Sequence, residues 1–162
     1  MRNRRVRRLL PFVGLVIALL LVAACTPPPA PSLSPVENDV FGKHFVYRAA
    51  HSLPELQLDD GVSAHAKAWA DTLAAQAPSC SALTSVGNKG HSDIARDFAG
   101  QSAAENVGCV SGCPANADVV WGLWLQSPGH LTNIQNPVYN RIGVGVTCRN
   151  GLQFLVVDFT AV

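Results

Sequence analysis

Apolar residues recur at three- and four-residue spacing in two stretches of the chain, which is the pattern of a helix with one buried face. The first stretch covers residues 36–50 and stops before Pro54. The second follows the pair Asp59-Asp60, either of which can cap a helix, and continues to Pro78. The spacing therefore predicts two amphipathic helices, one directly after the other.

The middle of the chain is less regular. Residues 79–92 contain the turn formers Gly87, Asn88 and Gly90, so we expect irregular structure there. A short helix is predicted over 93–98, and a longer one from Pro114 to Gln126, ended by Ser127-Pro128-Gly129. The apolar side chains expected on the inner side of this helix are Val119, Val120, Leu123 and Trp124.

The pattern at the end of the chain predicts a β-hairpin. The runs Ile142 to Thr147 and Leu152 to Phe159 are rich in β-branched and apolar residues, and Asn150-Gly151 between them is typical of a tight turn. Helices first and a hairpin last predict an α+β protein. The length of 162 residues is that of one domain, not two.

The beginning of the chain has a different character. Five arginines lie within residues 1–8, and an uncharged apolar run over 9–24 follows them. This order predicts a secretory signal peptide over 1–24, because the run is shorter than the roughly 20 apolar residues of a membrane-spanning helix. The whole chain has a formal charge of +1, but without the five leader arginines seven Lys and Arg face eleven Asp and Glu, which gives −4. An acidic body argues against a nucleic-acid partner.

Cys25 directly follows Ala23 and Ala24, which is the pattern of a bacterial lipobox, where the thiol receives lipid. The alternative is a signal peptide cut elsewhere, with Cys25 unmodified. The Pro- and Ser-rich segment 26–35 favours the lipobox, because a lipid anchor needs an extended tether. We therefore expect a lipidated cysteine and tether over 25–35 and a folded domain over 36–162, anchored to the outer face of the cell membrane as a lipoprotein.

Four cysteines remain in the body, and an even number in an oxidising compartment predicts two disulfides. Three pairings are possible. Cys109 and Cys113 can close a small local loop, which leaves Cys80 to pair with Cys148, and this is the pairing that we expect. A zinc cluster of four thiolates is the weaker interpretation, because such sites usually carry two closely spaced pairs.

Three short motifs follow one another along the body: Gly90-His91-Ser92, Ala104-Glu105-Asn106-Val107 and Ser127-Pro128-Gly129-His130. Asn133-Ile134 and the segment Tyr139 to Gly145 come after them. In this order they resemble the CAP family of cysteine-rich secretory, antigen 5 and pathogenesis-related 1 proteins, whose domain is also called SCP and which has bacterial members. The resemblance extends over residues 36–162.

The resemblance implies a three-layer α-β-α sandwich with a mainly antiparallel central sheet, and a surface cleft formed by His91, Glu105 and His130. Two imidazoles and a carboxylate can bind zinc or another divalent cation weakly, although no cofactor is required. They can equally form a buried network that pins loops to the sheet. Many relatives add a second glutamate before the second histidine, but this chain has no acidic residue between Asp118 and Asp158, which argues against a four-residue metal site.

Three functions remain open. The first is a lipid-anchored binding module for a small apolar ligand, an envelope component or a protein partner, and the resemblance implies lipid ligands. The second is a metal-dependent hydrolase with Glu105 as the base, and the third is a purely structural envelope protein. The absence of a Gly-x-Ser-x-Gly nucleophile motif favours binding over catalysis. His44, His51 and His65 are assigned no role.

Overall fold

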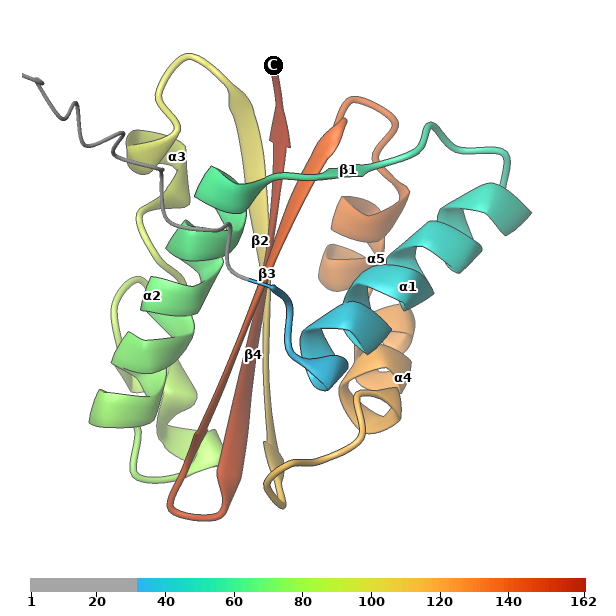
Figure 1. Cartoon of the computed structure of the whole chain (residues 1–162). Coiled ribbons are helices and arrows are strands. Elements are labelled where there is room, and N and C mark those ends of the chain that lie inside the picture. The colour runs from blue at the N-terminus through green and yellow to red at the C-terminus, as the bar shows by residue number, and fades with distance from the viewer. Residues whose placement is uncertain (1–31) are drawn as a thin grey trace, which may run out of the picture.

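Figure 1 shows the computed structural model, in which one sheet lies edge-on between two layers of helices. The structure describes residues 32–162, so the expected signal peptide, Cys25 and most of the tether lie outside the described residues. The helices are α1 (Pro35–Ala50), α2 (Asp60–Gln76), a 3-10 helix η1 (Cys80–Ser85), α3 (Ile94–Asp97), α4 (Asp118–Gln126) and α5 (Pro128–Gln135). The strands are β1 (Gln57–Leu58), β2 (Ser102–Ser111), β3 (Arg141–Arg149) and β4 (Leu152–Ala161). Within 32–162, every helix is too short or too polar to cross a membrane.

The strands have the order β1-β3-β4-β2, and β4 runs antiparallel to both of its neighbours. The short β1 is parallel to β3, so the sheet is mixed but mainly antiparallel. α2 and α3 cover one face, and α1, α4 and α5 cover the other (Figure 1). The predicted α+β class and the three-layer sandwich are therefore confirmed.

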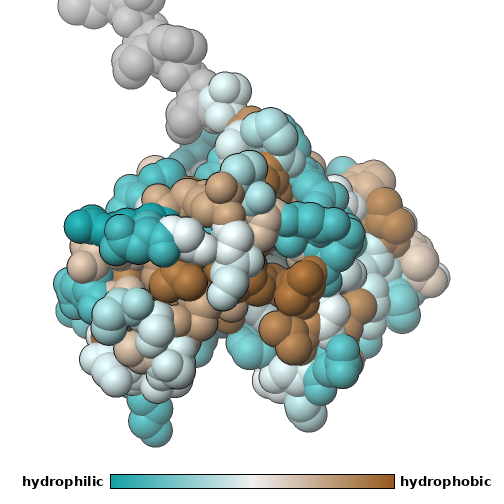
Figure 2. Space-filling view, turned by 90° about the horizontal axis from the view of Figure 1, so that it is seen from below, coloured by the Kyte–Doolittle hydropathy of each residue, from teal (hydrophilic) through white to brown (hydrophobic). Residues whose placement is uncertain are grey.

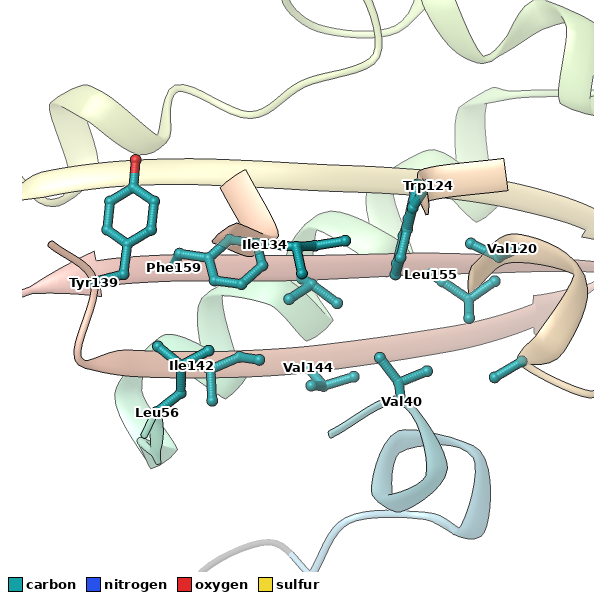
Figure 3. Close-up of a cluster of buried hydrophobic side chains, with 12 residues drawn as sticks. Val40, Leu56, Val120, Trp124, Ile134, Tyr139, Ile142, Val144, Leu155 and Phe159 are labelled. Carbon is teal, nitrogen blue, oxygen red and sulfur yellow. The ribbon is translucent and has the colours of Figure 1, made fainter. Parts of the chain in front are cut away.

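Side chains of β4 alternate between two cores, because successive residues of a strand point to opposite faces. Leu155, Val157 and Phe159 join the core under α1, α4 and α5, which Figure 3 shows with Trp124 and Ile134 packed against them. Phe154 and Val156 face the other way and pack under α2. The strand is thus buried on both faces, which explains its nearly continuous apolar run.

The hairpin between β3 and β4 turns as its sequence predicts. Asn150 and Gly151 both have positive φ, at 52° and 74°, which is the conformation of a type I′ turn. The two helices predicted at the beginning of the domain are also confirmed as α1 and α2, and Asp59 caps α2 by accepting from the backbone of Val62.

The helix predicted from Pro114 is wrong at its start, because α4 begins only at Asp118. Gln153 on β4 accepts a hydrogen bond from the backbone of Ala115 and donates one back to its carbonyl, which holds this segment against the sheet in a non-helical form. Val120 and Trp124 are buried as expected. Val119 and Leu123 are 59% and 57% exposed, contrary to the prediction that they face inward.

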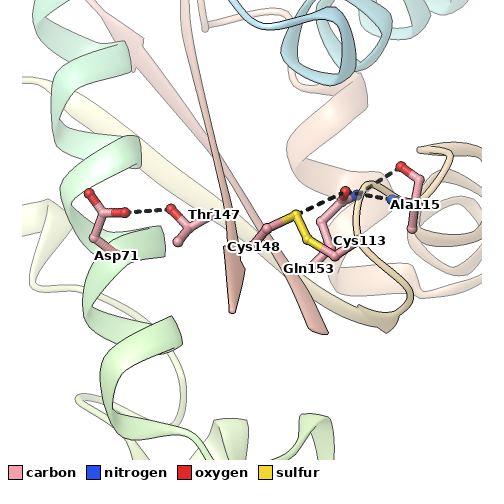
Figure 4. Close-up of a disulfide and its surroundings, with 6 residues drawn as sticks. All are labelled: Asp71, Cys113, Ala115, Thr147, Cys148 and Gln153. Atoms are coloured by element: carbon pink, nitrogen blue, oxygen red, sulfur yellow. Dashed lines mark hydrogen bonds between the residues drawn. A yellow bond between two sulfur atoms is a disulfide. The ribbon is translucent and has the colours of Figure 1, made fainter. Parts of the chain in front are cut away.

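The expected disulfide pairing is also wrong. The bonds join Cys80 to Cys109 and Cys113 to Cys148. Figure 4 shows why: neighbouring residues of β3 point to opposite faces, so Thr147 bonds Asp71 of α2 while Cys148 points away from α2 toward Cys113. Cys109 lies on the α2 face beside η1, which carries Cys80. Cys80 and Cys148 are therefore on different sides of the sheet.

Candidate functional site

His91 and Glu105 are brought together at the edge of the sheet by strand β2 and the turn before α3. The Nδ1 atom of His91 lies 2.8 Å from Oε1 of Glu105, whose side chain is 1% exposed. Ser92 adds two bonds to the same carboxylate, one from its backbone N–H at 3.0 Å and one from its hydroxyl at 2.8 Å. Three donors thus hold Glu105, and they fix the loop of His91 to β2.

His130 approaches the same edge strand from the opposite face, on α5. The side chain of Asn106, which neighbours Glu105 on β2, donates to the His130 carbonyl at 3.1 Å, and Asn133 donates to the Asn106 oxygen at 2.8 Å. These amides dock the helix on the strand. Burial and the nearby charge of His91 lower the pKa of His130.

The three residues expected to form one cleft line separate hollows: His91 and Glu105 share one of about 400 Å³, and His130 lines a different one. His91 also lines a cavity of about 360 Å³ on the α2 side, together with Trp69 and Asn88. The His130 cavity, of about 320 Å³, lies between η1 and α4. The Cys80–Cys109 disulfide forms part of the wall of the His130 cavity, which is otherwise lined by Leu83, Val107, Gly108, Val120, Leu123, Trp124 and Ser127.

The His130 cavity is mainly apolar. Trp124 lines it, with its ring centroid 6.3 Å from that of His130, and its N–H donates to the Val107 carbonyl. Figure 2 shows the underside of the molecule, where hydrophobic surface gathers on both sides of a hollow between two lobes. The His130 cavity thus offers a nonpolar enclosure with an imidazole in its wall.

A metal centre does not match this arrangement. A three-ligand site needs an oxygen of Glu105 and a nitrogen of each histidine to face one ion, but three of the four lone-pair positions of Glu105 already accept bonds from His91 and Ser92. Among residues 32–162, no group of three or more His, Cys, Asp or Glu side chains is arranged to hold an ion. We therefore derive no chemistry from a metal at this site.

Two further ionisable residues, His65 and Asp158, lie behind Glu105. Asp158 is the register partner of Glu105 across β4 and β2, and its side chain is fully buried. His65 of α2, which was assigned no role, places Nδ1 2.6 Å from Asp158 and Nε2 3.2 Å from Asp97. Burial, and after it the negative charge of Glu105, raises the pKa of Asp158 to about 7. The hydrogen bond to Asp158 raises the pKa of His65 to about 9.

The chain belongs to the cysteine-rich secretory protein (CAP) family, whose model matches residues 41–159. A comparison with curated proteins gives no significant match. Among solved structures, the chain is similar to an outer surface protein of Borrelia burgdorferi, at 19% identity and a TM-score of 0.59, with 76% of this chain and 90% of that one covered.

Two further structures share the fold. Venom allergen-like protein 4 of Schistosoma mansoni matches at 13% identity and a TM-score of 0.60, over 80% of this chain and 90% of that one. An extracellular protein of Bacillus anthracis that contains a SCP domain matches at 20% identity and a TM-score of 0.51, over 82% of this chain but only 45% of that one. At these identities the likeness concerns the fold.

Proposed function

We propose that this protein is a lipid-anchored binding module of the bacterial envelope, which takes a small apolar ligand in the His130 cavity. The observation that carries the proposal is the composition of that cavity: its volume of about 320 Å³ lies within the usual range of ligand sites, and its wall is mostly aliphatic and aromatic. Burying apolar ligand surface there gains roughly 25 cal/mol per Å² removed from water.

The hydrogen bonds that Glu105 already makes favour binding over hydrolysis. Glu105 is committed to His91 and Ser92, and the Nδ1 atom of His130 is buried without a hydrogen-bond partner among the described residues. A general base must reach a substrate proton or an activating water, and the Glu105 carboxylate is held away from that task by its bonds to His91 and Ser92. The two sides of β2 instead form a rigid frame, held by Asn106 and Asn133, around a nonpolar hollow.

The location at the cell surface is part of the same proposal. It is supported by the leader and lipobox pattern, by the two disulfides, which belong to oxidising compartments, and by the names of two fold relatives, one an outer surface protein and one extracellular.

The proposal is tested by incubating a soluble chain of residues 32–162 with a lipid extract of bacterial envelope, reisolating the protein and identifying retained molecules by mass spectrometry. Because this chain lacks Cys25, any retained lipid is a ligand and not the anchor. We expect apolar molecules to be retained by the native chain and lost from Leu123→Asp, which puts a charge in the cavity wall. Equal retention by both chains, or none by the native chain, overturns the proposal.

A further inference from the structure

The outer surface of α1 carries apolar, aromatic and basic side chains side by side. Phe45 and Val46 are 46% and 66% exposed, although a surface helix normally turns such residues inward. Beside them, α1 and Trp121 of α4 line a shallow groove of about 580 Å³. Among the residues that line the groove are Lys43, Val46, Tyr47 and His51.

The aromatic members of this surface are held in place by packing. Tyr47 stacks on His51 with ring centroids 4.0 Å apart, and it meets the edge of Trp121 at 5.8 Å. The Tyr47 hydroxyl accepts a bond from the side chain of Gln135 at 2.8 Å. Tyr and Trp rings with one apolar part and one polar part are the side chains that favour the boundary between lipid and water.

The basic member is Lys43, which pairs with Asp118 and, at 3.5 Å, with Asp39. A lysine stem can lie along apolar surface while its ammonium group stays in water. Because the carboxylates of Asp39 and Asp118 both face the Lys43 ammonium, this surface carries no net positive charge. Attraction to acidic lipids would therefore not hold it on a bilayer. The contact would depend on burial of apolar side chains.

The number of residues between Cys25 and α1 limits how far this helix can lie from a lipid anchor. Ser34 caps α1, and only nine residues lie between Cys25 and the first helical residue, Pro35. Fully extended, such a segment spans at most about 35 Å, and a polyproline conformation makes it shorter. An anchor at Cys25 therefore keeps α1 within reach of the bilayer surface.

We infer that the outer face of α1, with Phe45, Val46 and Trp121, rests on the outer leaflet of the membrane that holds the anchor. The inference rests on the lipid anchor of the proposed function, but it is independent of the ligand in the His130 cavity, which opens between η1 and α4. Docking of α1 would fix the orientation of the domain and leave that cavity free to receive a ligand.

The test reconstitutes the full lipidated chain in phosphatidylcholine vesicles whose acyl chains carry bromine, which quenches nearby indoles. Trp121 lies in the docking face, whereas Trp69 lies on α2 across the sheet. We expect strong quenching of tryptophan fluorescence, which Trp121→Phe removes and Trp69→Phe leaves intact. The quenching should persist at 1 M salt, because the contact is apolar.

The face itself is tested with matched pairs of exposed residues. Phe45→Asp with Val46→Asp should lower the quenching at least threefold, while Val138→Asp with Val162→Asp should leave it unchanged, since all four positions are exposed. The inference is overturned if the first pair of substitutions leaves the quenching unchanged, or if Trp69→Phe removes the quenching. It is also overturned by a chain that leaves the vesicles altogether, or by one that buries this face by dimerising. Retention of apolar ligands by residues 32–162 is measured without vesicles, so the two proposals fail separately.

Discussion

The imidazole of His65 lies 2.6 Å from the carboxyl group of Asp158, which is 93 residues further along the chain. His65 projects from α2 and Asp158 from the centre of β4, so this pair joins a helix to the sheet directly behind Glu105. The pKa of His65 is raised to about 9, first by the hydrogen bond to Asp158. Folding therefore keeps a proton on this ring that the unfolded chain releases above its ordinary pKa of 6.5.

This linkage predicts how stability depends on pH. Between pH 6.5 and 9 the folded state holds a proton on His65 that the unfolded state has released, so raising the pH lowers the stability there. The stabilisation from His65 is therefore fully present below pH 6.5 and is lost as the pH rises through 9. We expect the difference in unfolding free energy between the native chain and His65→Gln to shrink from pH 6 to pH 9.5, measured by urea denaturation. His51→Gln, which changes an exposed histidine, serves as the control. A His65 difference that stays constant over this range contradicts the prediction.

A second prediction concerns the buried guanidinium of Arg48, which is 1% exposed. It donates to the carbonyls of Ile134 at 2.9 Å and Asn136 at 3.0 Å, at the end of α5, and to that of Pro54 at 2.8 Å. Arg48→Met leaves the buried carbonyl of Ile134 and two partly buried ones without this donor, which should cost about 3 kcal/mol of unfolding free energy. Arg149→Met, at an exposed position, should change it by less than about 0.5 kcal/mol. Equal effects of the two substitutions in chemical denaturation would show that Arg48 does not tie α1 to α5.

The disulfides give a third prediction. Peptide mapping of the unreduced protein should recover Cys80 linked to Cys109 and Cys113 linked to Cys148. Replacing either pair by serine should lower the free energy of unfolding by about 3 to 4 kcal/mol, because each bond closes a loop of about 30 residues in the unfolded chain. A peptide that links Cys109 to Cys113 would refute the connectivity.

The elements with strong local signals could be predicted from the sequence. Helices α1 and α2 have caps and a clear apolar period, and the hairpin has Asn150-Gly151 between two apolar runs. Strand β2 has no such signal, since it consists largely of small and polar residues and is a strand because it pairs with β4 along its whole length. Helix α5 is not predicted, because Ser127-Pro128-Gly129 is typical of a helix end, although serine before proline also begins helices.

The candidate site shows the same limit. The motifs predict His91, Glu105 and His130 as cleft residues, but their distribution over separate hollows depends on which face of β2 each residue meets. The cysteine pairing likewise depends on the alternation of Thr147 and Cys148 across the sheet. The sequence carries one signal for His65 and Asp158: Asp158 is the single charged residue in the largely apolar run 152–159, and a charge in a strand buried on both faces needs a partner.

The central claim, that the His130 cavity binds an apolar ligand, is tested most directly by the dissociation constant of a fluorescent anilinonaphthalene dye for residues 32–162. Leu123 and Val119 are exposed aliphatic residues of the same helix, but only Leu123 lines the cavity. The account predicts that Leu123→Asp weakens binding at least tenfold, about 1.4 kcal/mol, while Val119→Asp leaves it within twofold and both keep the native unfolding midpoint. Equal dissociation constants for the two variants would contradict it.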